Sequence, residues 1–379
     1  MHFNTIRIDV DEVKGRRGGG KMIEDQARWI AAGILMFVLA GFVLTVVLVR
    51  RANSRERALE ALPATPMARV SVGMHWDGDA SMPIPNWEAI AEAEPAEAGA
   101  DALHVYWTSA ARQWLESLNQ QLGDHYAVTE SADFLLLSNL EARPTTVVLQ
   151  TCQRMLARIR RSLGALAVEQ GMGKHVVIVF ADDDDYYGYV SNYYPEGGEY
   201  AMSSGMFIRA GYGHFVVPLA IMDAMEPVIA HELTHCLLQH LPIPAWLNEG
   251  LAVNTEHTMF PHLAMPSAQK YFQHEIPARH AAYWNADSIQ TFWSGKSFLA
   301  TDDGNALSYD LAKKITALAA GNEPAFRAFV AEASMDDSGV AAAQHLGYPL
   351  EHLVQAVLGE GDWSPKPERW RRDVERGQF

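Results

Sequence analysis

The segment from Val228 to Asn254 restricts the fold of this chain more than any other, because it reads as two helices joined by a tight turn. Its first half, Val-Ile-Ala-His-Glu-Leu-Thr-His-Cys-Leu-Leu-Gln-His, places His231 and His235 one helical turn apart on the same face. Two closely spaced prolines follow, and Pro244 suits the first turn of a second helix. We therefore expect two packed helices here.

The side chains of this segment are those of a catalytic metal site. Both imidazoles can point at one ion, and Glu232 can reach a water on that ion without being a ligand. Glu249, fourteen residues after His235, can present its carboxylate to them if the second helix folds back. Two histidines and one glutamate leave a fourth zinc position open. We predict His231, His235 and Glu249 as ligands of one Zn²⁺ per chain, and Glu232 as the general base.

The context of the first helix agrees with this prediction. Asp223 and Glu226 resemble a capping box, Pro227 is tolerated in a first turn, and Pro242 ends the far side. With 15 histidines in 379 residues, chance gives this spacing on the order of a few hundredths of an occurrence per chain. The alternative is an ordinary helix that carries two surface or capping histidines.

His-Glu-Leu-Thr-His followed by Pro-Ala-Trp-Leu-Asn-Glu-Gly-Leu-Ala resembles the gluzincin metallopeptidases, and most of all their peptidase MA-like branch. The resemblance covers about residues 225–255, and a similar order of sheet before helices extends over about 100–360. It implies an α+β, zincin-like core with the zinc ligands and base named above. The chain departs from thermolysin in its shorter gap from His235 to Glu249. It also has Asn254 where the acidic partner of a zinc histidine is sought, which leaves that partner unassigned.

The resemblance also implies groups outside the two helices. Related aminopeptidases have an oxyanion-stabilising tyrosine roughly sixty residues after the glutamate ligand, which corresponds to Tyr309 here. The rival candidates are His257, His280 and Tyr283. Gluzincins bind peptides along an edge strand, and the segment Ser203, Ser204 and Gly205 is the candidate for substrate binding. No aminopeptidase Gly-x-Met-Glu-Asn motif is present, so endopeptidase and exopeptidase action both stay open.

Residues 29–49 contain no charged side chain and form the most apolar run of the chain. As a helix they would span about 31 Å, enough for a bilayer core of about 30 Å. Arg50 and Arg51 follow directly, which favours an uncleaved single-pass anchor over a signal peptide. Five basic residues on the N-terminal side against four on the other leave the membrane face of the body undetermined. A start at Met22 would favour the cytoplasmic face.

The rest of the chain divides by its hydrophobic pattern. We expect strands at 69–74, at two sites within 125–138, at 175–181, and in a hairpin of 206–209 with 214–217, and a long amphipathic helix over 145–166. The resulting division is a tail (1–28), the membrane helix (29–49), a linker with a short strand (50–102), an α/β lobe (103–222), the zinc helices with a helical lobe (223–362) and a C-terminal tail (363–379), either packed by its tryptophans or free.

Charge excludes one class of partner. Residues 58–379 carry twenty basic and forty acidic side chains, and a body this acidic is repelled by phosphate backbones. We expect no nucleic-acid partner, and leave the oligomeric state open. The leading hypothesis is a membrane-anchored zinc peptidase acting on peptides or proteins. The alternative is a membrane-anchored binding or assembly module on an inactive peptidase-like scaffold, and a non-peptide amide substrate also stays open.

Overall fold

The computed structural model describes residues 69–77, 82–123, 125–167, 173–193, 203–261 and 271–370. All of them belong to a unit that extends from Pro63 to Phe379. The expected membrane helix at 29–49 and the tail before it lie outside the described residues. Among the helices that are described, none combines the length and the apolar character needed to cross a bilayer.

The architecture is mixed: five strands form one small sheet, and helices make up most of the remainder. The strands are β1 (Ala127–Glu130), β2 (Phe134–Ser138), β3 (His175–Phe180), β4 (Met206–Ile208) and β5 (His214–Pro218). The helices are α2 (Trp87–Glu92), α3 (Ala100–Leu122), α4 (Ala142–Leu163), α5 (Asp183–Val190), α6 (Met222–Leu238), α7 (Ala245–Met259), α8 (Ile276–Tyr283), α9 (Ile289–Trp293), α10 (Asp303–Ala319), α11 (Glu323–Glu332) and α12 (Glu351–Leu358).

The sheet has the strand order β1-β2-β3-β5-β4. Its three central strands β2, β3 and β5 are parallel, with Phe134 opposite His175 and Val176 opposite His214. The two outer strands run antiparallel to their neighbours. The expected strand pair within 125–138 and the hairpin of β4 with β5 are thus confirmed.

The central strands are apolar at nearly every position because both faces of the sheet are covered. On one face Leu136, Val177 and Phe215 join the large core that contains α4, α6 and α7. On the other face Leu137 and Val176 pack with residues of α2, α3 and α5. Alternation along each strand therefore assigns successive residues to two different cores.

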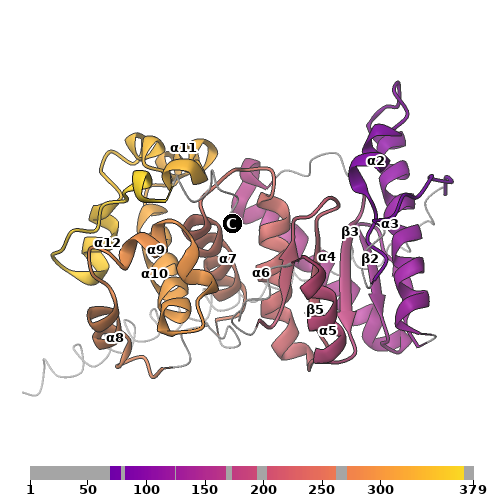
Figure 1. The fold of residues 1–379 in the computed structure, drawn as a ribbon, viewed down its shortest axis with the longest axis horizontal. Coiled ribbons are helices and arrows are strands. Elements are labelled where there is room, and N and C mark those ends of the chain that lie inside the picture. Colours follow the sequence, from indigo (N-terminus) through magenta and orange to yellow (C-terminus); the bar gives the residue numbers. More distant parts are fainter. Residues whose placement is uncertain are drawn as a thin grey trace, which may run out of the picture. The chain divides into compact units, whose positions relative to one another are not determined.

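Helix α6 connects the sheet to the helices that follow. It contacts β4, β5 and α4 on one side and α7 on the other, and α7 in turn packs against α10. Figure 1 shows α6 and α7 between the sheet and the later helices α8 to α12. The segment that carries the predicted metal ligands is thus in the middle of this unit, where packing from both sides fixes its position.

Two expectations for the region before residue 103 are wrong. The segment 69–74 forms no strand; only one isolated bridge, between Trp76 and Pro85, occurs there. The linker expected at 50–102 contains α2 and the start of α3, and the buried Trp87 and Ile90 anchor α2 in the second core. The linker therefore ends before Trp87, because two large apolar side chains outweigh the Ala/Glu-rich composition around them.

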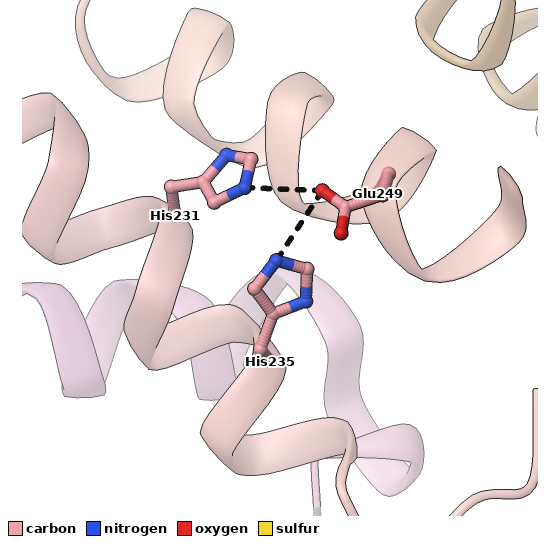
Figure 2. A group of neighbouring side chains, drawn as sticks. All are labelled: His231, His235 and Glu249. Carbon is pink, nitrogen blue, oxygen red and sulfur yellow. Dashed lines mark ion pairs between the residues drawn. The ribbon is translucent and has the colours of Figure 1, made fainter. Parts of the chain in front are cut away.

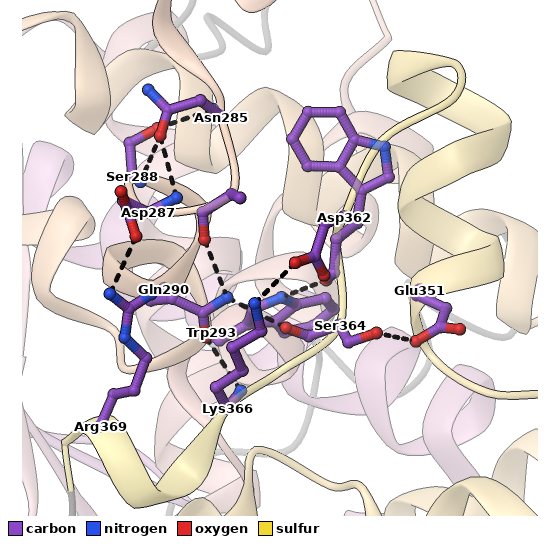
Figure 3. Close-up of polar contacts among 12 residues, drawn as sticks. Asn285, Asp287, Ser288, Gln290, Trp293, Glu351, Asp362, Ser364, Lys366 and Arg369 are labelled. Atoms are coloured by element: carbon purple, nitrogen blue, oxygen red, sulfur yellow. Dashed lines mark hydrogen bonds and ion pairs between the residues drawn. The ribbon is translucent and has the colours of Figure 1, made fainter.

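The C-terminal segment packs through its tryptophans as far as residue 370. Trp363 and Trp370 are buried in the large core. The indole N–H of Trp293 donates to the Trp363 carbonyl at 2.8 Å, and Gln290 donates to the Ser364 carbonyl at 3.0 Å. Figure 3 shows these contacts together with the ion pair of Arg369. The expected tail at 363–379 is thus part of the fold over its described residues.

Candidate metal centre

Helix α6 positions the two histidines and Glu232. Ile229, Leu233 and Leu237 are fully or almost fully buried in the core shared with the sheet and α4. This apolar stripe fixes the rotation of the helix about its axis. His231 and His235 consequently lie on the side that meets α7.

The expected capping box of α6 is absent. The helix begins one residue before Asp223, without a side-chain cap, and Glu226 instead accepts a hydrogen bond from the Thr151 hydroxyl at 3.2 Å and lies 3.5 Å from Arg154. Pro227 is therefore the sixth residue of the helix rather than part of its first turn, and its ring removes the helical bond to the Asp223 carbonyl. Packing on the sheet and α4, not local capping, holds this end of the helix.

Helix α7 follows Pro244 as expected and carries the third predicted ligand. Trp246 and Leu247 are completely buried and attach the helix to the core. Gly250 permits a close approach, but to α10 rather than α6: a Cβ at this position would lie 2.7 Å from the Ala312 carbonyl oxygen. Glu249 is the neighbour of this glycine and faces α6.

The structure brings the three predicted ligands together. One carboxylate oxygen of Glu249 (Oε2) lies 3.3 Å from Nε2 of His231 and 3.4 Å from Nε2 of His235. Figure 2 shows both imidazoles of α6 turned toward the carboxylate on α7. Within the described ranges, this is the one group of three or more His, Cys, Asp or Glu side chains with converging ligand atoms, which lie within 4.8 Å of one another.

The distances from Glu249 to the two imidazoles fit zinc. Tetrahedral ligands at zinc distances of about 2.0–2.2 Å lie about 3.3–3.6 Å from each other, which matches the two distances to Glu249. Oε2 of Glu249 is also buried and makes no hydrogen bond, although two imidazole nitrogens face it. A buried carboxylate oxygen without a hydrogen bond is costly, and a cation between the three side chains would satisfy it.

The pKa values of these groups reflect burial and their mutual charges. Burial lowers the pKa of His231, but Glu249 and Glu256 outweigh burial and raise it well above the usual value. Burial raises the pKa of Glu249, and the imidazoles of His235 and His231 reverse this and hold it well below its usual value. The pKa of Glu232 stays raised by burial, because the imidazoles offset only part of that effect. Glu232 is thus the more basic of the two carboxylates in the site.

The second nitrogen of each imidazole has a partner on α7, and sequence reasoning assigned neither role. Nδ1 of His235 lies 3.1 Å from Oδ1 of Asn248, and Nδ1 of His231 lies 3.3 Å from Oε2 of Glu256. Asn254, where an acid was sought, instead donates to the carbonyl oxygens of Gly250 and Lys313. Glu256 is seven residues after Glu249, which is two turns along the same helix face. This spacing is the sequence signal that places Glu256, like Glu249, next to the histidines.

The edge strand β4 adjoins Glu232. The backbone N–H of Phe207 donates a hydrogen bond to the Glu232 carboxylate. A Cβ on Gly205 would lie 3.4 Å from Cγ of Glu232 and would overlap Val228, so only glycine allows the chain to pass this close to α6. Gly205 is thus next to the candidate base, as the predicted substrate-binding segment requires.

The two serines of that segment have different surroundings. The hydroxyl of Ser203 shares a hydrogen bond of 2.8 Å with the buried Tyr186 hydroxyl, and Ser204 is exposed. The hydroxyl of Ser203 therefore contacts α5, through Tyr186. Substrate binding by Ser203, Ser204 and Gly205 stays a prediction.

Tyr309 lies near the metal ligands. It is on α10, and its ring centroid is 6.4 Å from that of His231 and 5.2 Å from that of Phe298. The packing of α10 on α7 produces this proximity. Its catalytic role stays a prediction.

The rival candidates for this role are His280, Tyr283 and His257, and the first two make hydrogen bonds elsewhere. His280 is buried, accepts a hydrogen bond from the Trp284 indole at 2.9 Å and lies 2.7 Å from the Asp310 carboxylate. The Tyr283 hydroxyl contacts the carboxylate of Asp302. Burial and the Lys313 charge lower the pKa of His257, which is in the last turn of α7. The hydrogen bonds of His280 and Tyr283 are thus made to groups other than the predicted metal ligands.

Comparison with known proteins adds no family assignment, since no family model, curated protein or solved structure matches this chain. The chemistry of the site must therefore be argued from its own geometry. The two imidazoles and the carboxylate with the unsatisfied oxygen can hold a divalent cation. The second, more basic carboxylate can move a proton next to that cation, and the strand edge adjoins both.

Proposed function

We propose that this protein is a zinc-dependent peptidase of the gluzincin type, anchored in a membrane by residues 29–49. The observation that carries the proposal is the convergence of His231, His235 and Glu249, in which Oε2 of Glu249 lies at tetrahedral zinc spacing from both imidazoles, with Glu232 as a second buried carboxylate beside them. The donor set of two nitrogens and one oxygen is that of catalytic rather than structural zinc sites.

The residues have distinct roles in hydrolysis. His231, His235 and Glu249 would hold Zn²⁺, which when bound acidifies a water molecule and polarises a carbonyl group. Glu232 accepts the proton of the attacking water and then transfers it to the nitrogen of the leaving amine, as the C–N bond breaks. Its raised pKa, caused by burial, makes it a stronger base than an exposed glutamate.

The adjoining strand edge supports a peptide as the substrate. Among the described residues β4 pairs with β5 alone, so its other edge is next to α6 and the candidate base. An extended peptide can add to such an edge by main-chain hydrogen bonds. Pairing there would bring a backbone amide close to Glu232, because Phe207 of this strand already contacts it.

Tyr309 would stabilise the negative charge that develops on the substrate oxygen during the same reaction. A phenol donates its O–H to an oxygen that gains negative charge, and such donors contribute most when water is excluded. The ring is partly buried between Phe298 and His231. The ring therefore lies on the same side of the site as the first histidine.

A cleavage assay with matched glutamate variants tests this proposal. The full-length protein in mild detergent is loaded with zinc and incubated with casein and with internally quenched peptides. Glu232→Gln should retain zinc and lose at least about 10²-fold in kcat, the usual effect of removing a general base. Glu226→Gln, on the same helix but paired with Thr151 and Arg154, should cleave like the unaltered protein. Full cleavage by Glu232→Gln, or no cleavage of any peptide by zinc-loaded protein, would contradict the proposal.

A further inference from the structure

The imidazole of His231 lies between two carboxylates of a single helix. Nε2 is 3.3 Å from Glu249, and Nδ1 is 3.3 Å from Glu256. Only the first of these nitrogens also belongs to the group whose ligand atoms converge with those of His235. The two ring nitrogens of His231 therefore have separate tasks, one toward the ion and one toward Glu256.

Glu256 is placed for this contact by the helix itself. It is seven residues after Glu249, so both side chains extend from the same face of α7. The residue is only 8 % exposed, and a carboxylate this buried is rarely tolerated without a partner. Its carboxylate oxygen Oε2 lies 3.3 Å from Nδ1 of His231, which is consistent with a specific role rather than a solvated surface position.

We propose that Glu256 is the positioning residue of the metal site: it accepts the Nδ1–H of His231 and so keeps the Nε2 lone pair directed at the ion. This inference rests on the proposed function, because it assumes that Zn²⁺ is the ion. The geometry distinguishes Glu256 from Asn254, whose side-chain N–H group is bound to the Gly250 and Lys313 carbonyls. The acid is therefore found two residues further along α7 than Asn254.

Two consequences follow for the site. Asn248 orients His235 through a neutral amide oxygen, whereas Glu256 orients His231 through a carboxylate. The Nε2 atoms of the two histidines therefore differ in how strongly they donate an electron pair to the ion. Glu249 and Glu256 together also supply two negative charges, which balance a divalent cation in a buried place. One helix thus contributes the third ligand and both orienting groups, and a change in its packing would affect all of them together.

Zinc affinity tests the inference without relying on cleavage. The full-length protein in detergent is titrated with zinc against a chelating dye, for the unaltered chain and for Glu256→Gln, Glu256→Ala and Glu332→Gln. Loss of an outer carboxylate typically weakens zinc binding about 10–100-fold. Glu256→Ala should show this loss, and Glu256→Gln a smaller one because its amide oxygen still accepts a hydrogen bond. Glu332 contacts His345 at 2.7 Å on the surface, so Glu332→Gln removes a similar pair and should leave the affinity unchanged.

A spectroscopic measurement separates positioning from a merely structural effect. In zinc-loaded protein with ¹⁵N-labelled histidine, His231 should carry its proton on Nδ1, and Glu256→Ala should alter that ring signal while the signal of His345 stays the same. Zinc dissociation constants within twofold of the unaltered protein in both Glu256 variants would overturn the inference. A protein that binds no zinc would overturn it together with the proposed function. Zinc binding weakened by Glu256→Ala without any peptide cleavage would support this inference and contradict the peptidase.

Discussion

Replacing Gly250 with alanine tests the packing that holds α7 between the zinc helix and α10. The new Cβ would lie 2.7 Å from the Ala312 carbonyl oxygen and 2.9 Å from Cβ of Thr316. Ordinary contact begins near 3.4 Å, so the backbone of α10 has to retreat by about 0.7 Å. Overpacking of this kind costs about 1–3 kcal/mol of the free energy of unfolding. Because α10 also carries Tyr309, the change should weaken cleavage in addition to stability.

Gly188 provides the matched control. It is exposed within α5, and a Cβ there would meet only the end of the Met82 side chain at 4.0 Å. Gly188→Ala should therefore stabilise the protein by about 0.5–1 kcal/mol, the usual gain of alanine over glycine in a helix. Urea unfolding followed by tryptophan fluorescence measures both variants. If Gly250→Ala also stabilised the protein, the close approach of α7 and α10 could not be the reason for this glycine.

Three further predictions concern the predicted catalytic tyrosine, a buried histidine and a buried cluster of ion pairs. Tyr309→Phe should lower kcat by about 10²–10³-fold with an unchanged zinc dissociation constant; equal rates would exclude the role. Burial lowers the pKa of His214 to about 4, so the unfolded chain binds a proton below about pH 6.5 that the folded one does not. The free energy of unfolding should thus fall by about 3 kcal/mol between pH 6.5 and 4, and a His214→Asn variant should lack this part of the pH dependence. Glu130 contacts Arg112 and, at 2.7 Å, Lys174, so Glu130→Gln should cost about 3–5 kcal/mol in urea unfolding because two buried cations remain; a loss below 1 kcal/mol would refute this.

The local patterns of the sequence predicted the grouping of His231, His235 and Glu249 because they are encoded at short range. The i, i+4 spacing of His231 and His235 and the helix start after Pro244 depend on backbone geometry within a few residues. The apolar runs at 175–181 and 214–217 likewise predicted strands, which are β3 and β5. The convergence of Glu249 with the histidines follows from these two helices and a short turn, and it required no knowledge of the remaining chain.

The errors arose where tertiary contacts outweigh local pattern. Asp223 and Glu226 have the spacing of a capping box, but packing of α6 lets the helix begin earlier. Trp87 was not recognised as an anchor, because its partners Trp114 and Tyr212 come from distant parts of the sequence. Glu256 was missed because the acidic partner was sought at a family position instead of two turns along the helix.

Zinc content tests the central claim most directly. The full-length protein, purified with zinc supplied, is analysed by elemental mass spectrometry beside Glu249→Ala and Glu232→Gln. The geometry predicts one zinc per chain in the unaltered protein, retention in Glu232→Gln, and loss or marked weakening in Glu249→Ala. A folded unaltered protein that binds no zinc, or a Glu249→Ala variant that binds it equally well, would contradict the metal centre and the peptidase mechanism built on it.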